Sequence, residues 1–258
     1  MNRAFLTLIF LYFSSPIYSQ TDWGRVITGT VKAGQAYMLS DEDLAKMVQK
    51  EVATMDRQNK VCGENNKYTK RLRSLTKGTT DANGIKLNFK VYQTTDLNAF
   101  ACPDGSVRVY SALMDLFNDN ELLGVIGHEI GHVALRHVKS AWKDALLRSA
   151  ASDMIGSRSK TWAAVSDSYL GSVASAALSA KHSRYHETQA DDYGYEFLKK
   201  CGKNPWALGL AFKKLKALSK QGNKKYQKLL EAFSSHPDFD ERINRVKEKA
   251  KKDGYNCN

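Results

Sequence analysis

The sequence predicts an α+β fold that is mainly helical, with a small antiparallel sheet beside the helices. Apolar residues recur at helical spacing in residues 41–58 and again from residue 119. Between them, residues 87–110 alternate apolar and polar side chains around a turn. A chain of 258 residues with 42% hydrophobic and 26% charged residues can bury one sizeable core.

The first nineteen residues have the composition of a secretory signal peptide. Arg3 gives a basic start, residues 4–13 are almost wholly apolar, and residues 14–19 are small or contain proline. This apolar run is shorter than the roughly 20 residues that span a bilayer, which favours a cleaved signal over a membrane anchor. Residues 15–21 contain no lipid-anchor cysteine. We therefore expect a signal peptide at 1–19, one mature domain at 20–258, and a periplasmic or secreted protein.

The elements follow from local signals in chain order. Ser40 is an N-cap for a helix at 41–58, and a second helix at 67–77 ends before Gly78. Residues 87–91 read as a half-buried strand, and the runs at 98–101 and 107–110 flank Pro-Asp-Gly as a hairpin. From Asp119 onward the chain reads as helices, and charged residues interrupt every apolar run in 139–180.

Four cysteines lie far apart in the sequence, without C-x-x-C spacing, which argues against a structural zinc knuckle. An oxidising compartment would favour disulfides among Cys62, Cys102, Cys201 and Cys257. Three pairings are possible. Cys201 with Cys257 is preferred because both belong to the C-terminal helical part, and free buried thiols are the alternative.

The formal net charge is +12, and removing the one arginine of the signal gives 12 − 1 = +11. Many of the lysines lie between residues 213 and 252. Solvated lysine faces on helices are the preferred interpretation, and no nucleic acid is expected as a partner. Peripheral association with a membrane or with anionic envelope polymers is the alternative.

The strongest chemical signal is His128-Glu129-Ile130-Gly131-His132, an H-E-x-x-H sequence inside a predicted helix. Four residues make about one helical turn, so both imidazoles project from one face and can share one zinc ion. Glu129 lies on the rim of that face, where it can act as general base. A catalytic zinc site needs a third protein ligand, and Glu187 is our candidate.

Glu187 and Asp191 are again four residues apart in a helical segment. In this arrangement Glu187 binds the metal, and Asp191 accepts a hydrogen bond from a ligand imidazole. A solvated helix face is the alternative for this pair. His137, His182 and His186 are interpreted as packing or surface residues, since His137 falls five residues after His132.

Four motifs occur in order: Asn-Ala-Phe-Ala at 98–101, the segment 121–132, Ser-Arg-x-x-Glu-x-x-Ala-Asp at 183–191, and His-Pro at 236–237 with Arg242-Ile243. Together they resemble the HtpX and CAAX prenyl protease family of gluzincins over about residues 40–250. The resemblance implies a zincin-type fold, one zinc per chain and endopeptidase activity. Charge-interrupted helices stand where membrane members carry spanning helices, as in the soluble periplasmic branch.

The resemblance also implies roles for outer residues. Asn98, Ala99, Phe100 and Ala101 would form a sheet edge that binds extended substrate, with ordinary hairpin pairing as the alternative. His236 would be a gating fourth ligand or an oxyanion stabiliser, and Arg242 would orient it or bind a carboxylate. A helix-cap histidine and a surface arginine are the alternatives.

We therefore expect a zinc endopeptidase that cleaves unfolded or misfolded exported proteins. Its mechanism would use Glu129 to activate water and His236 to help hold negative charge. Two other classes remain open: a non-catalytic holdase or assembly factor built on the zinc fold, and a polyanion-binding module suggested by the lysines.

Overall fold

The computed structural model describes residues 40–153, 167–219, 236 and 238–257. The predicted signal peptide at 1–19 and the lysines at 220–228 lie outside these residues. The described helices are α2 (Asp41–Gln58), α3 (Lys67–Leu75), α4 (Ser111–Leu116), α5 (Asp119–Ala134), α6 (His137–Asp153), α7 (Asp167–Leu178), α8 (Arg184–Lys200), α9 (Trp206–Ser219) and α11 (Phe239–Lys252). The strands are β1 (Asp81–Ala82), β2 (Ile85–Lys86), β3 (Asn88–Tyr92), β4 (Ala99–Ala101) and β5 (Ser106–Tyr110).

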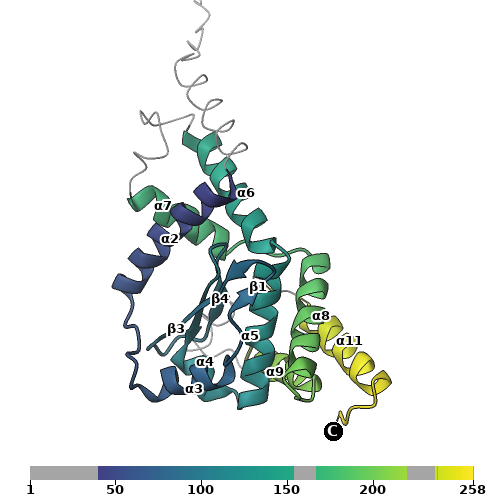
Figure 1. Ribbon diagram of the computed structural model, residues 1–258. Coiled ribbons are helices and arrows are strands. Elements are labelled where there is room, and N and C mark those ends of the chain that lie inside the picture. The colour runs from purple at the N-terminus through teal and green to yellow at the C-terminus, as the bar shows by residue number, and fades with distance from the viewer. Residues whose placement is uncertain (1–39, 154–166, 220–235, 237, 258) are drawn as a thin grey trace, which may run out of the picture.

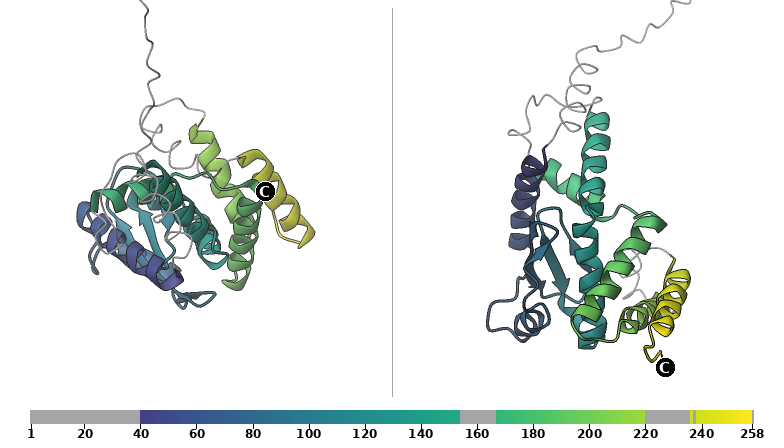
Figure 2. Two further views of the ribbon diagram at one scale, coloured as in Figure 1. Left: turned by 90° about the horizontal axis from the view of Figure 1, so that it is seen from above. Right: turned by 45° about the vertical axis from the view of Figure 1, so that its right-hand side comes forward.

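Helix α5 lies at the centre of the molecule, between the sheet and α8 (Figure 1). Helices α9 and α11 pack together beside α8, and α9 also contacts α5. Helices α2, α6 and α7 form a separate group above the sheet, as the turned views show (Figure 2). The predicted mainly helical α+β fold is therefore confirmed. No helix of the described residues is long and apolar enough to cross a membrane.

The main sheet has the strand order β3-β5-β4. The predicted hairpin is present, with β4 antiparallel to β5 and Phe100 opposite Arg108. The sheet is mixed, because β3 runs parallel to β5, with Asn88 opposite Ser106. The chain reverses before β4 and again before β5, so β3 and β5 point the same way. This order leaves β4 at one edge of the sheet.

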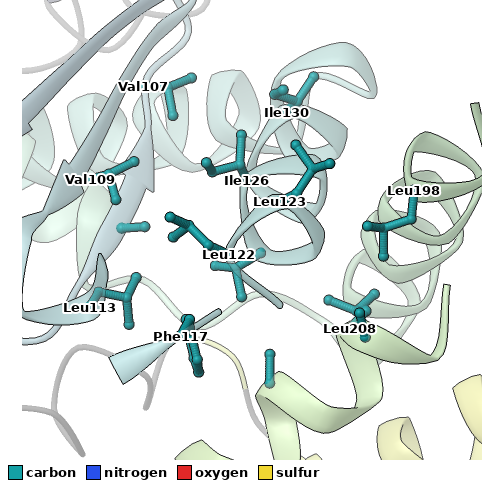
Figure 3. Close-up of a cluster of buried hydrophobic side chains, with 14 of the residues drawn as sticks. Val107, Val109, Leu113, Phe117, Leu122, Leu123, Ile126, Ile130, Leu198 and Leu208 are labelled. Atoms are coloured by element: carbon teal, nitrogen blue, oxygen red, sulfur yellow. The ribbon is translucent and has the colours of Figure 1, made fainter. Parts of the chain in front are cut away.

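The core lies where α5 packs between the sheet and the helices that follow (Figure 3). Leu122, Ile126 and Ile130 repeat at helical spacing and are fully buried. They meet Val107 and Val109 of β5 on one side. Burying such a side chain contributes about 1.5–3 kcal/mol, so this layer fixes the helix against the sheet.

A second cluster joins α2, α6 and α7 to the other face of the sheet, and Trp142 and Leu44 are buried there. Asp56 of α2 accepts hydrogen bonds from Arg108 Nε (2.9 Å), Lys90 Nζ (2.7 Å) and Tyr92 Oη (2.7 Å). Burial raises the pKa of Asp56, but these donors outweigh it and lower the pKa to about 2. The network ties α2 to β3 and β5.

The four cysteines are free thiols in the structure. The favoured pairing of Cys201 with Cys257 is therefore absent. Cys201 is exposed at the end of α8, whereas the Cys257 thiol lies 3.5 Å from the carbonyl oxygen of Tyr255. Cys62 and Cys102 are buried, as the free-thiol alternative predicts.

Candidate metal centre

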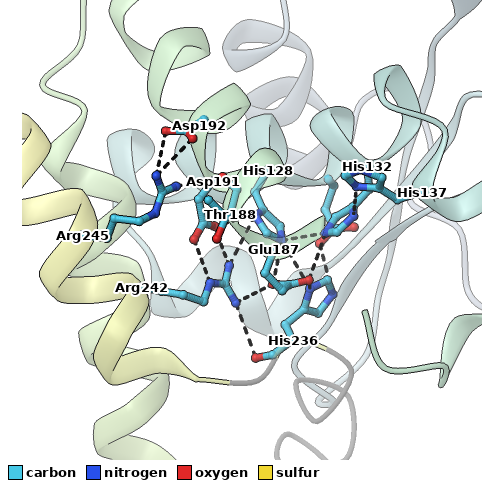
Figure 4. Close-up of polar contacts among 11 residues, drawn as sticks. His128, His132, His137, Glu187, Thr188, Asp191, Asp192, His236, Arg242 and Arg245 are labelled. Carbon is cyan, nitrogen blue, oxygen red and sulfur yellow. Dashed lines mark hydrogen bonds and ion pairs between the residues drawn. The ribbon is translucent and has the colours of Figure 1, made fainter. Parts of the chain in front are cut away.

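Helix α5 presents two imidazoles on one face. Its N-terminus has a capping box, in which Asn118 accepts from the Glu121 backbone and Glu121 accepts from the Asn118 backbone. The helix is regular through the H-E-x-x-H segment, and His128 and His132 are buried one turn apart. Their Nε2 atoms lie 3.0 Å from each other (Figure 4).

Helix α8 brings Glu187 to the same point. Glycines allow the two helix backbones to meet: a Cβ on Gly127 would lie 3.2 Å from Gly194 Cα, and one on Gly194 would lie 3.0 Å from the His128 backbone nitrogen. At this separation Glu187 Oε1 lies 3.3 Å from His132 Nε2, and Oε2 lies 3.7 Å from His128 Nε2.

His236 completes a group of four donors. Its Nδ1 lies 3.3 Å from His128 Nε2 and 2.9 Å from Glu187 Oε1. One ligand atom from each of His128, His132, Glu187 and His236 lies within 4.8 Å of the others, and all four residues are buried. Ligands 2.0–2.1 Å from a tetrahedral zinc ion are about 3.3 Å apart, so the observed spacing and the nitrogen and oxygen donor set fit zinc.

Two of the donors, His132 and Glu187, have protonation states that suit a metal ion. Burial lowers the pKa of His132 well below its ordinary 6.5, which keeps this imidazole neutral. Burial raises the pKa of Glu187, but His236 and Arg242 outweigh it, so the net pKa falls below 4.5 and the carboxylate stays ionised. Neutral imidazole and ionised carboxylate are the forms that bind metals.

Asp191 and Arg242 lie directly behind the donors. Asp191 Oδ1 lies 2.9 Å from His128 Nδ1. Arg242 of α11 donates from Nε and Nη2 to the two oxygens of Asp191, and its Nη1 lies 2.7 Å from Glu187 Oε2. Neither predicted alternative, a solvated α8 face or a surface arginine, holds, because these side chains are buried.

Glu129 is buried on α5 between the two histidines. Its Oε1 lies 3.8 Å from His236 Nε2, on the side of the imidazole opposite Nδ1. Burial raises the pKa of Glu129 above its ordinary 4.5, and the nearby His236 opposes this shift. A raised carboxyl pKa moves the group towards the range in which a general base works well near neutral pH.

The predicted edge at 98–101 is the outer strand of the sheet. The Asn98 carbonyl accepts from Tyr110 N, and Cys102 N donates to the Ser106 carbonyl. Main-chain groups of an antiparallel strand alternate in direction, so those of Ala99 and Ala101 point away from β5. Phe100 is buried against Tyr92 and Tyr110, so its side chain belongs to the core.

The remaining three histidines pack beside the metal donors. His137 Nδ1 lies 3.0 Å from His132 Nδ1, and the His182 ring stacks on His132 with centroids 4.1 Å apart. Burial lowers the pKa of His137 to about 4. Hence all six histidines of the chain belong to one cluster: His128, His132, His137, His182, His186 and His236.

One feature of the sequence indicated this cluster, namely the grouping of five histidines in residues 128–137 and 182–186. Helical spacing concealed the position of His137. Five residues correspond to about 500°, or 140° away from His132 on a continuous helix. The helix in fact ends at Ala134, and Arg136 has φ of +61° before α6 begins at His137. The chain therefore turns back over His132.

Comparison with known proteins agrees with this geometry. The model of peptidase family M48 matches residues 66–250. The chain belongs to peptidase family M48. This M48 peptidase is 39% identical to metalloprotease YcaL of Escherichia coli over 88% of each chain, and 35% identical to metalloprotease LoiP of the same organism over 90% of each chain. It is also 31% identical, over 52% of its length and 29% of the relative's, to the beta-barrel assembly-enhancing protease of Escherichia coli.

Membership of this family establishes the class of reaction. The M48 peptidase is a zinc-dependent metalloendopeptidase with a zincin-type domain, and the buried cluster on α5 and α8 is positioned for a metal ion. The resemblance inferred from the four sequence motifs is thereby confirmed.

Proposed function

We propose that His128, His132 and Glu187 hold one zinc ion per chain for hydrolysis of internal peptide bonds. The observation that carries this assignment is the spacing of the three donor atoms, 3.0, 3.3 and 3.7 Å, which brackets the edge of a zinc tetrahedron. A zinc ion supplies Lewis acidity, which polarises a carbonyl and brings the pKa of bound water to about 7.

Glu129 is the proposed general base. Its carboxylate accepts a proton from the attacking water and carries it to the leaving amine. Three features support this role: its place between the two histidines on α5, its burial, and its raised pKa.

Asp191 and Arg242 are proposed to hold the ligands in place. Asp191 accepts from His128 Nδ1, which leaves Nε2 unprotonated and directed at the metal. Arg242 contacts Asp191 and Glu187 together. Its charge keeps both carboxylates ionised in a buried site.

His236 is proposed to act as a gate. Its Nδ1 takes the fourth corner of the donor group, which supports the fourth-ligand role over the oxyanion role. A catalytic zinc site keeps one position open for water or substrate, so His236 must leave this corner before hydrolysis. The residue then serves to block the site while no substrate is bound.

The outer edge of β4 is the proposed binding site for the substrate backbone. The main-chain groups of Ala99 and Ala101 face away from β5, and β4 contacts α5. An extended peptide can add there as a further strand, with recognition through the backbone instead of through particular side chains. Unfolded segments adopt this extended form readily, which favours unfolded or misfolded proteins as substrates.

We further propose that residues 1–19 direct export, that residues 20–258 form one domain, and that the protein acts in the periplasm or outside the cell. The composition of residues 1–19 supports this proposal. The similarity to a protease named for enhancing beta-barrel assembly is consistent with beta-barrel proteins as substrates. The lysines of α9 and α11 support peripheral association with anionic lipid or polymer.

Two measurements test the proposal. The wild type should contain one zinc per chain, and His132→Ala and Glu187→Ala should lose it. Retention of one zinc in either variant would contradict the ligand assignment. Substrate class is tested with one disulfide-bonded protein in its native form and in its reduced, carboxymethylated form. Cleavage of the unfolded form alone is expected, and equal cleavage of both would exclude selectivity for unfolded chains.

A further inference from the structure

We propose that His137 is a positioning residue for His132, and that Gln189 fixes the tautomer in which it acts. The inference rests on the proposed zinc ligation by His132. Its basis is a chain of three hydrogen bonds that leads from the metal centre along α8 to the surface. His137 lies beside His132 at the start of α6, on the side away from Glu187 (Figure 4).

The contacts connect three elements. His132 Nδ1 of α5 lies 3.0 Å from His137 Nδ1 of α6. His137 Nε2 lies 3.1 Å from Gln189 Oε1 of α8. Gln189 Nε2 donates to Tyr185 Oη at 3.2 Å, and Tyr185 is exposed. Each nitrogen and oxygen atom named in these three hydrogen bonds therefore has a partner.

The zinc ligation determines the direction of every bond. When His132 Nε2 binds a metal, its Nδ1 carries the proton of the neutral ring and must donate. His137 Nδ1 is then the acceptor, so the proton of the neutral His137 is on Nε2. That N–H donates to the Gln189 carbonyl oxygen, which leaves the Gln189 amide to donate to Tyr185. One arrangement of protons satisfies all three contacts.

The backbone places His137 for this task. Arg136 has a left-handed conformation, with φ of +61°, which ends α5 and starts α6. The Asn83 side chain donates to the Ala134 carbonyl at 3.2 Å and so caps the end of α5. His137 is consequently held over His132 although it follows it by only five residues.

Burial of both rings makes the hydrogen bond between His132 and His137 important for zinc binding. His132 is 0% exposed and His137 is 4% exposed, so little room exists for water to replace the imidazole as acceptor. Without His137 the Nδ1–H of His132 loses its acceptor, and the ring loses the contact that sets its rotation. Loss of such a partner typically reduces metal affinity or activity 10–100-fold. The Nδ1 atom of the other histidine ligand, His128, contacts the ionised Asp191. The Nδ1 atom of His132 instead contacts the neutral ring of His137.

The affinity test compares two substitutions of the same kind in the mature protein. His137→Phe removes the acceptor and keeps an aromatic ring, whereas His186→Phe changes a ring that stacks on His137 at 4.1 Å outside the hydrogen-bond chain. Zinc affinity is measured by competition with a chromophoric chelator, and unfolding of the metal-free proteins by urea. We expect a 10–100-fold weaker zinc affinity for His137→Phe alone, with urea midpoints of the two variants alike. Equal affinities of the two variants would overturn the proposal.

His132→Ala separates this inference from the function on which it rests. Zinc binding unaffected by His132→Ala would refute the proposed ligation itself. Loss of zinc in His132→Ala, with unchanged affinity in His137→Phe, would refute only the role of His137.

A second measurement needs no substitution. In zinc-loaded wild type labelled with ¹⁵N-histidine, two-bond nitrogen–proton correlations report which ring nitrogen carries the proton. We expect His137 to be protonated at Nε2 and unprotonated at Nδ1. A proton on His137 Nδ1 would overturn the proposal, because that nitrogen could not then accept from His132.

Discussion

The guanidinium of Arg242 makes two parallel hydrogen bonds with the carboxylate of Asp191, from Nε at 2.8 Å and from Nη2 at 2.6 Å. Arg242 belongs to α11 and Asp191 to α8, so this pair joins the C-terminal helix to the ligand-bearing helix. Asp191 in turn contacts His128, and Arg242 also contacts Glu187. The orientation of two proposed zinc ligands thus depends on one buried ion pair.

Removal of Arg242 should strongly destabilise the protein. Arg242→Met leaves Asp191 and Glu187 buried without their cation, which typically costs about 3–5 kcal/mol. Arg245→Met is the matched control, since Arg245 is on the same helix and pairs with the partly exposed Asp192. Loss of such an exposed ion pair costs about 0–1 kcal/mol. Urea unfolding of the metal-free proteins at pH 7 measures both. Similar losses in the two variants would contradict the importance of the buried pair.

The close contact of α5 and α8 should not tolerate a methyl group at Gly194. A Cβ there would lie 3.0 Å from the His128 backbone nitrogen and 3.1 Å from the Gly124 carbonyl oxygen, neither of which can move alone. We expect Gly194→Ala to separate the helices and weaken zinc binding. Gly171→Ala is the control, because its Cβ would lie 3.8 Å from its nearest neighbour and alanine favours the helix by about 1 kcal/mol. Unchanged zinc affinity in Gly194→Ala would refute this account of the interface.

The gate assigned to His236 predicts a gain of activity. In His236→Ala the fourth position of the donor group is always open. Every protein molecule then has an accessible site, so kcat/KM for a short unstructured peptide should rise. An oxyanion role would instead lower kcat by about 10²–10³-fold. Steady-state kinetics on the zinc-loaded variant decides between them, and a fall of this size would refute the gate.

The Asp56 network predicts an acid-dependent loss of stability. The pKa of Asp56 is lowered from 3.8 to about 2 in the folded protein, so its stabilisation is complete above about pH 4. It is lost as the pH falls from about 4 to 2, and this shift corresponds to about 2 kcal/mol. Urea unfolding of metal-free wild type and Asp56→Asn should differ at pH 5 and converge near pH 2. A difference that stays constant over this range would contradict the network.

Local signals in the sequence predicted the elements that carry the chemistry. Ser40 caps α2 and Asn118 caps α5, and both helices begin where the sequence placed them. The four-residue spacing of His128 with His132, and of Glu187 with Asp191, predicted which side chains share a face. In the structure the two residues of each pair lie on one face, because each pair belongs to one regular helix.

Long-range relationships were not predictable in the same way. The parallel pairing of β3 with β5 depends on two chain reversals, and only the second, at the Pro-Asp-Gly turn between β4 and β5, was predicted from the sequence. Arg108 has the sequence context of a polar strand residue, yet it is buried and its partner Asp56 is 52 residues away. The contact of His137 depends on the left-handed turn at Arg136, an arginine that carries no sequence signal for such a conformation.

In the proposed reaction, this chain cleaves peptide bonds with Glu129 as general base at a zinc site on α5 and α8. The most direct measurement is cleavage of unfolded casein by the mature protein with one equivalent of zinc, beside Glu129→Gln and a chelated sample. We predict cleavage by the wild type alone, with Glu129→Gln still binding one zinc. Cleavage by Glu129→Gln at the wild-type rate, or no cleavage by zinc-loaded wild type, would contradict the account.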